Sequence, residues 1–154
     1  MVKRILYVII WSLLLSLAWS CNDEDGNETL VSKNKDTESH NAGLDCTTCH
    51  KAGGDGEGWF NISGSVYDST KIIFQPDGKI RIHTEPNGSG SLYATIEVDG
   101  LGNFYSTGDI DWGEGLYVFI EGINGDIRHM LSSVKQGACN SCHDGKTQDR
   151  IWVK

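Results

Sequence analysis

Two short segments of this 154-residue chain, residues 46–50 and 139–143, share the pattern Cys-x-x-Cys-His. This spacing is typical of covalent haem attachment, in which two cysteine sulfurs form thioethers to the vinyl groups of one haem. The imidazole that follows directly can then ligate the iron. The sequence therefore predicts two haem c groups, one held by Cys46 and Cys49 and the other by Cys139 and Cys142, with His50 and His143 as proximal iron ligands.

The fifth cysteine, Cys21, has a different setting. Lys3 and Arg4 are followed by an apolar run over residues 5–17, which is shorter than the roughly 20 residues of a spanning helix. This pattern indicates a secretory signal peptide over residues 1–20. Because Cys21 resembles the lipidated first residue of bacterial lipoproteins, we expect export and a lipid anchor in the outer membrane, facing the periplasm or the cell surface. An ordinary signal peptide with an incidental cysteine and a membrane-spanning anchor are the alternatives.

Three other chemistries use paired cysteines. In a Cys₄ zinc site the two pairs are usually separated by roughly 15–20 residues, whereas 89 residues lie between Cys49 and Cys139. Disulfides suit an exported domain, and a thioredoxin-like pair needs a βαβ context. Neither zinc nor disulfides would use His50 and His143, so haem is the leading interpretation.

The sixth ligand of each iron must come from another part of the chain. The candidates are Met130, His83 and His129, while His40 is expected to be free unless its loop folds back over a haem. Met130 precedes Cys139 by nine residues and can reach the second haem, with the first haem and a role in core packing as alternatives. For His83 the alternative is a solvated surface position. Successive strand residues point to opposite faces, so only one of His129 and Met130 should ligate a given haem. We expect one His–Met haem and one bis-His haem.

The chain between the two motifs must position them, and its pattern predicts β-strands. From about residue 59 to 134, apolar and polar residues alternate with a period of two, most clearly over residues 92–98 and 116–121. Shorter candidate strands are residues 60–67, 71–74, 79–83, 103–106 and 126–131. Turn formers such as Asn87-Gly88 and Asn124-Gly125 separate them. Six or seven short strands predict a mainly β fold, a small sandwich or barrel.

The segment before the first motif has a different composition. Residues 22–45 are polar and charged, so residues 21–45 are expected to form a lipidated, flexible acidic tether ahead of a di-haem domain over residues 46–154. The acidic start at residues 22–25 resembles the surface-export tag of some Gram-negative lipoproteins, with a solvating linker as the alternative. The net charge of −8 argues against binding to nucleic acid. It favours partners with basic docking faces, whose association weakens with salt.

Residues 46–145 resemble small multihaem c-type cytochromes in which the haem motifs flank a sandwich similar to carboxypeptidase regulatory-like domains. The resemblance is carried by residues 64–68 (GSVYD), 98–105 (VDGLGNFY) and 137–143 (GACNSCH). It implies an immunoglobulin-like sandwich, electron transfer at or outside the outer membrane, and a methionine shortly before the second motif, which Met130 matches. The implied partners are redox proteins, among them other multihaem cytochromes, and copies of the chain could form an oligomer or filament.

Electron transfer without substrate turnover is thus the leading function. A small haem enzyme that reduces peroxide or nitrite at an open sixth position is the enzymatic alternative. A surface lipoprotein that uses its cysteines for zinc or disulfides is the structural alternative.

Overall fold

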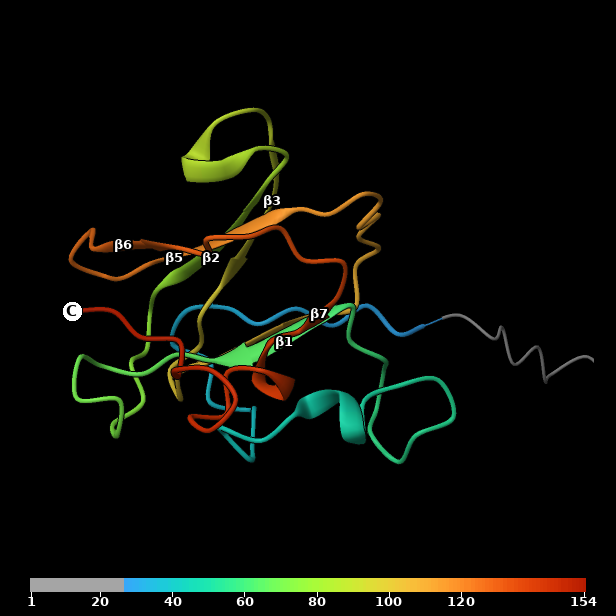
Figure 1. Cartoon of the computed structure of the whole chain (residues 1–154). Coiled ribbons are helices and arrows are strands. Elements are labelled where there is room, and N and C mark those ends of the chain that lie inside the picture. Colours follow the sequence, from blue (N-terminus) through green and yellow to red (C-terminus); the bar gives the residue numbers. More distant parts are fainter. Residues whose placement is uncertain (1–26) are drawn as a thin grey trace, which may run out of the picture.

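The computed structural model describes residues 27–154. The predicted signal peptide, the predicted lipidation site at Cys21 and the acidic residues 22–25 lie outside the described residues. Two packed β-sheets make up the described part, and short 3₁₀ turns lie beside them (Figure 1). No helix within residues 27–154 is long and apolar enough to cross a membrane.

Seven strands form the two sheets. They are β1 (Ile62–Ser65), β2 (Lys79–His83), β3 (Leu92–Glu97), β4 (Asn103–Ser106), β5 (Tyr117–Glu121), β6 (Ile127–His129) and β7 (Gly137–Ala138). One sheet has the strand order β4-β1-β7 and the other β3-β2-β5-β6. Neighbouring strands are antiparallel except β1 and β7, which run parallel. The prediction of a small, mainly β sandwich is confirmed.

The hydrophobic core lies between the sheets and is made by the alternating residues of the strands. On β2 and β5, Ile80 pairs with Ile120 and Ile82 with Val118, and all four are buried. Phe104 is fully buried on the opposite sheet. Full burial of a side chain of this kind stabilises the fold by roughly 1.5–3 kcal/mol, so the period-two pattern supplies the main driving force for packing the two layers.

Two elements differ from the predicted strands. Residues 71–74 form a loop with a single bridge between Tyr67 and Phe74, so the strand predicted there is wrong. The reason is local, because Lys71 has a positive φ of 60° and Asp68 caps the turn by accepting from Thr70 N at 3.1 Å. The second difference is β7, whose two residues are too few to show alternation.

Residues 30–32, within the segment 27–45, lie along the edge of β4. Ser32 N donates to Tyr105 O at 3.0 Å and Thr107 N to Leu30 O at 2.9 Å. Ser32 is buried, and its hydroxyl donates to Glu97 O at 2.6 Å. The flexible tether expected up to residue 45 is therefore not seen over residues 27–45, because their hydrogen bonds cover an otherwise unpaired strand edge.

Candidate functional site

Both Cys-x-x-Cys-His segments fold into the same short turn. The 3₁₀ helices η2 (Cys46–Thr48) and η4 (Cys139–Ser141) each span three residues, and the backbone angles that follow them nearly coincide: φ −105° and ψ −41° at Cys49, φ −107° and ψ −42° at Cys142. In each turn the carbonyl of the first cysteine accepts from the second cysteine at 3.2 Å and from the histidine at 2.9 Å. The two sulfurs and the imidazole of each motif therefore line one pocket, and each motif has a pocket of its own.

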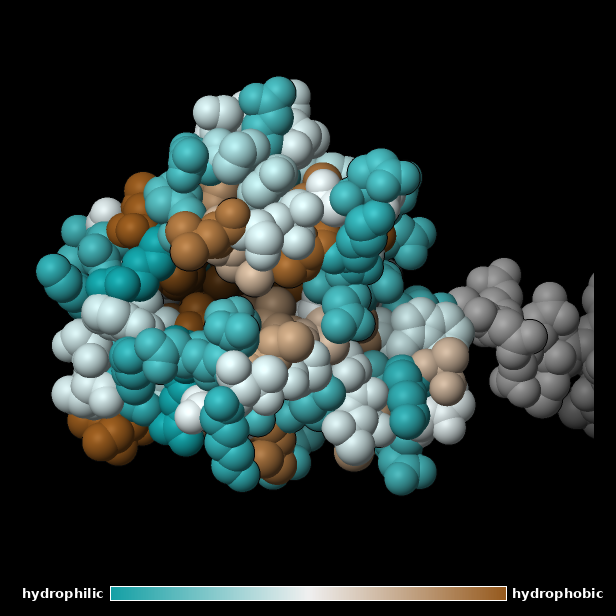
Figure 2. Space-filling model, viewed as in Figure 1, coloured by the Kyte–Doolittle hydropathy of each residue, from teal (hydrophilic) through white to brown (hydrophobic). Residues whose placement is uncertain are grey.

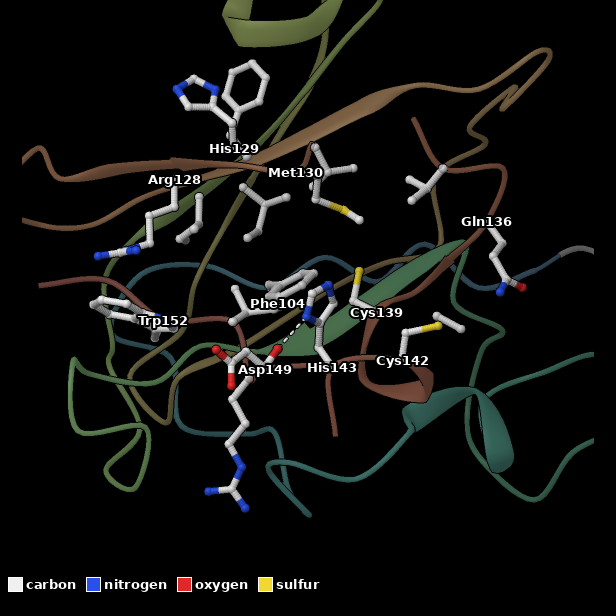
Figure 3. Close-up of a pocket in the computed structure, with 18 residues that line it drawn as sticks. Phe104, Arg128, His129, Met130, Gln136, Cys139, Cys142, His143, Asp149 and Trp152 are labelled. Atoms are coloured by element: carbon white, nitrogen blue, oxygen red, sulfur yellow. Dashed lines mark hydrogen bonds between the residues drawn. The ribbon is translucent and has the colours of Figure 1, made fainter. Parts of the chain in front are cut away.

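Each motif histidine has one ring nitrogen held by a backbone carbonyl. Nδ1 of His50 lies 2.9 Å from Glu57 O, and Nδ1 of His143 lies 2.6 Å from Asp149 O (Figure 3). A carbonyl oxygen can only accept, so the contact places a proton on Nδ1, and in the neutral imidazole Nε2 then has a free lone pair. This is the arrangement that orients a metal-ligating imidazole.

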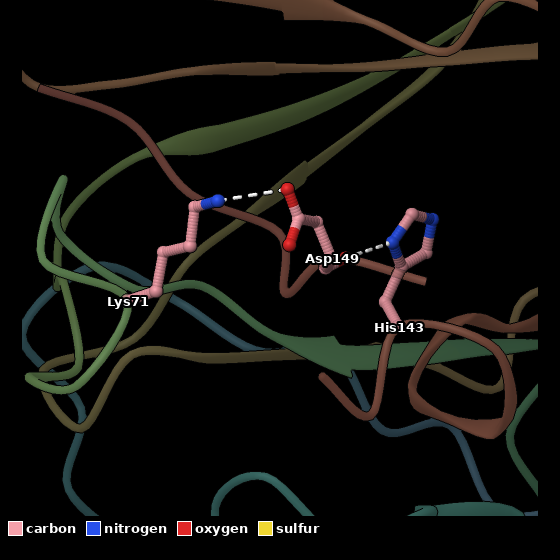
Figure 4. Close-up of polar contacts among 3 residues, drawn as sticks. All are labelled: Lys71, His143 and Asp149. Carbon is pink, nitrogen blue, oxygen red and sulfur yellow. Dashed lines mark hydrogen bonds and ion pairs between the residues drawn. The ribbon is translucent and has the colours of Figure 1, made fainter. Parts of the chain in front are cut away.

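The loops that supply these carbonyls pass close behind the rings. After His50 the chain is rich in glycine, and a Cβ on Gly56 would lie only 2.7 Å from the ring nitrogen Nδ1. After His143, the Asp149 carboxylate accepts from Lys71 Nζ at 2.7 Å while its carbonyl holds the imidazole (Figure 4). This hydrogen bond and the charge of Lys71 lower the pKa of Asp149.

The second motif opens into a cavity of about 280 Å³ between the two sheets. Figure 2 shows a recess lined by hydrophobic residues at this place, between the two layers. Phe104 and Met130 belong to its wall, with Arg128 stacked on Trp152 at 3.1 Å from the ring centroid. The Met130 side chain points into this space toward Cys139 (Figure 3). The expected proximity of Met130 to the second motif is thus present in the fold.

The side chains of the other two distal candidates, His83 and His129, do not point toward either motif. His129 contributes to the wall of the second cavity, but its ring points to the other side of the strand from Met130 (Figure 3). Its ring centroid lies 4.9 Å from that of Phe119, and His83 approaches the same phenyl ring at 4.6 Å. The structure therefore gathers His83 and His129 on the outer face of the four-stranded sheet and brings neither side chain to a Cys-x-x-Cys-His motif.

The first motif opens into a separate cavity of about 430 Å³ beneath the segment along β4. Its floor is an aromatic stack in which the rings of His50 and Phe60 are 4.1 Å apart and those of Phe60 and Tyr105 are 4.9 Å apart. His40 also lines this cavity. Burial raises the pKa of Tyr105, and Asp99, Glu38 and Asp36 act in the same direction, so this residue is a neutral phenol at physiological pH.

The two motifs lie side by side across β1. Ser63 pairs with Ala138, the residue before Cys139, and its side chain lies near Cys46 of the first motif. At the next position, a Cβ on Gly64 would lie 3.0 Å from the Cβ of Cys139. The short parallel strand β7 is therefore what brings the second motif against the first.

A buried polar network joins them. The Asn140 side chain accepts from Ser65 N at 3.0 Å and donates to Leu44 O at 2.8 Å. The Ser65 hydroxyl donates to Asn103 Oδ1 at 2.6 Å and accepts from Gly43 N at 2.8 Å. The sequence offers no signal for this network, because Asn140 and its partners are 75 and 96 residues apart.

The four motif cysteines are free thiols. Burial raises the pKa of Cys139 to about 12, with Cys46 and Cys142 acting in the same direction, and burial also raises the pKa of Cys46. A zinc site would need these sulfurs as thiolates on one common centre, whereas they open into two pockets. Within residues 27–154 no three His, Cys, Asp or Glu side chains are grouped to hold a metal ion.

These features fit covalently bound haem at both positions. Each pocket offers a pair of free cysteines, an imidazole whose Nδ1 is held by a backbone carbonyl and a largely apolar wall. The volumes lie near the lower end of the roughly 300–1,000 Å³ typical of ligand sites. Each pocket would therefore enclose part of a large planar cofactor and leave an edge at the surface.

Comparison of the chain with protein-family models, curated proteins and solved structures finds no match.

Proposed function

We propose that this chain is an electron-transfer protein that holds two haem c groups, one through Cys46 and Cys49 and one through Cys139 and Cys142. The observation that carries the proposal is the repeated geometry of the two motifs. Both form the same 3₁₀ turn, and in both a backbone carbonyl holds Nδ1 of the histidine and leaves Nε2 free. A haem bound in this way supplies a one-electron Fe(III)/Fe(II) couple.

The residues of the chain would tune that couple. His50 and His143 would ligate the iron through Nε2, and their carbonyl partners would fix the ring orientation and raise the basicity of the imidazole. Met130 points into the second pocket, where a thioether ligand raises the reduction potential. A protein ligand at that position favours an electron carrier over an enzyme, which would need the position open for its substrate.

The closeness of the motifs across β1 supports electron exchange between the two sites within one molecule. We further propose that the protein is exported and anchored to the outer membrane through lipid on Cys21, where it exchanges electrons with other redox proteins.

The test is production of the full chain in a host that attaches haem c. We expect a pyridine haemochrome spectrum with two haems per chain and an intact mass increased by two haem groups. Cys139→Ala/Cys142→Ala should retain one haem, and so should Cys46→Ala/Cys49→Ala. A colourless protein with unmodified sulfurs from that host would refute the proposal.

Lys71→Met serves as the matched control, because Lys71 lies beside the second motif but reaches it only through Asp149. This variant should retain both haems. The two double-cysteine variants then separate loss of one attachment site from general damage to the fold.

A further inference from the structure

The first pocket contains a second imidazole besides that of its motif. The rings of His40 and His50 have centroids 5.8 Å apart and planes inclined by 39°, and both residues line the same cavity. Phe60 stacks on His50 with planes only 9° apart, so the His50 ring is fixed by this stacking as well as by its carbonyl partner. His40 is therefore the histidine that the fold brings to the first motif.

The loop that carries His40 is anchored to buried residues on both sides. Ser39, the residue before it, accepts from Asn103 Nδ2 at 2.8 Å. Gly43 N donates to the Ser65 hydroxyl at 2.8 Å, and both anchors, Asn103 and Ser65, are buried. Gly43 has φ +85°, and a Cβ there would lie 2.5 Å from the hydroxyl of Tyr67. The backbone thus holds His40 near the first motif by contacts that do not involve its own side chain.

The other donor groups in this pocket are less suited to haem iron. The lining contains the carboxylates of Glu38, Asp45 and Glu57 and the phenol of Tyr105, and it contains no methionine. Carboxylates favour hard cations such as magnesium, calcium and manganese, whereas imidazole suits iron. Tyr105 would have to lose its proton to ligate iron, and its burial opposes this.

We infer that His40 is the distal iron ligand of the first site, an inference that rests on the proposed function. The two sites then carry different ligand pairs, His40 with His50 at the first and Met130 with His143 at the second. A His–Met pair gives a higher reduction potential than a pair of histidines. The first site is thus the low-potential site, and an electron shared within the molecule resides mainly on the second.

The experiment compares full-length holoprotein variants by visible spectroscopy and near-infrared magnetic circular dichroism. The wild-type protein should show one bis-imidazole and one imidazole–thioether haem, both low-spin. His40→Ala should convert one haem to a high-spin form that binds carbon monoxide, and added imidazole should restore the low-spin bis-imidazole signal. His40→Met should replace the bis-imidazole signal with a second imidazole–thioether signal and raise the lower of the two potentials.

His83→Ala and His129→Ala are the matched controls, because both histidines lie on the outer face of the four-stranded sheet. Each should leave the bis-imidazole signal unchanged. The inference is overturned if this signal survives in His40→Ala, or if a wild-type haem is already high-spin. Loss of the signal in either control overturns it as well. If the haemochrome assay finds two haems and the His40→Ala spectrum is unchanged, His40 is not the distal ligand, but the proposed function still holds. If no haem is found, both the ligand assignment and the proposed function are refuted.

Discussion

At the scale of single residues, Met130 and its neighbour His129 differ in the direction of their side chains. The strand alternation that predicts opposite faces for the two residues is confirmed, with Met130 in the second cavity and His129 against Phe119. The register of this strand determines whether the Met130 thioether or the His129 imidazole faces Cys139. A shift by one residue would exchange a thioether for an imidazole, because the side-chain period of a strand is two.

Met130→His should lower the potential of one haem, because replacement of thioether by imidazole removes the ligand that raises the potential. We expect a drop of more than about 59 mV, which corresponds to at least tenfold in the one-electron equilibrium constant. A potentiometric titration followed by visible spectroscopy measures this. Leu131→His is the control, since Leu131 is fully exposed; equal shifts in the two variants would contradict the assignment of Met130.

The four motif thiols should differ in reactivity in haem-free chain. At pH 8 a thiol with the pKa of Cys139, about 12, is ionised to roughly one part in 10⁴, against about a quarter for an unperturbed cysteine. Cys49 and Cys142 are exposed and Cys139 is less so, so timed alkylation with iodoacetamide and peptide mass mapping should modify Cys49 and Cys142 well before Cys139. The Cys139 rate should rise about tenfold per pH unit, because the thiolate is the nucleophile.

In haem-loaded protein none of the four should react, because thioether sulfur is no longer a thiol. Equal alkylation of all four cysteines in haem-free chain would contradict the burial of Cys139, and alkylation of the coloured protein would contradict thioether attachment.

At the scale of elements, β1 is the support shared by both motifs. β7 runs parallel to it on one side and leads directly into η4. Beside it, Ser65 joins Asn140 of the second motif to the loop before the first. A fully satisfied buried network of this kind specifies a single arrangement, whereas a partly satisfied one is costly.

Asn140→Leu should destabilise the holoprotein by about 2–3 kcal/mol, because it leaves the buried Ser65 N and the part-buried Leu44 O without their partner. Urea denaturation followed by far-ultraviolet circular dichroism measures this as a lower midpoint with an unchanged slope. Thr48→Ala alters an exposed residue in the turn of the other motif and should stay within about 0.5 kcal/mol of wild type. A similar loss of unfolding free energy in both variants would show that the buried network contributes no more to stability than an exposed side chain does.

At the scale of the whole molecule, two features bear on electron exchange. The sandwich holds the turns of both motifs beside strand β1, so two sites that are distant in sequence belong to one compact unit. The chain also carries a net charge of −8, which favours positively charged reaction partners.

Reduction of the oxidised holoprotein should depend on salt with a sign set by the reductant. With a cationic complex such as hexaammineruthenium(II), the rate should fall as ionic strength rises, because salt screens the attraction. With an anionic reductant such as dithionite, the rate should rise under the same conditions. Stopped-flow measurements between 10 mM and 500 mM salt would contradict the expectation if both rates changed in the same direction.

Part of this protein follows from the sequence by itself. The spacing of Cys46, Cys49 and His50 predicts a shared attachment site, because residues so close in sequence must also lie close in space. In the structure they form one turn and line one pocket. The strands Lys79–His83 and Asn103–Ser106 have their predicted bounds, because alternation on a strand is also a local property. The opposite directions of His129 and Met130 follow from the same rule.

The tertiary structure decided the rest. His40 belongs to a segment whose composition predicts a flexible tether. Hydrogen bonds of this segment to β4 and to Asn103 bring the His40 ring near His50. The two-residue strand β7 exists because β1 offers it a free edge, and Asn140 has its partners 75 and 96 residues away. Spacing along a chain determines which groups share one turn, whereas contacts between distant segments depend on how the whole core packs.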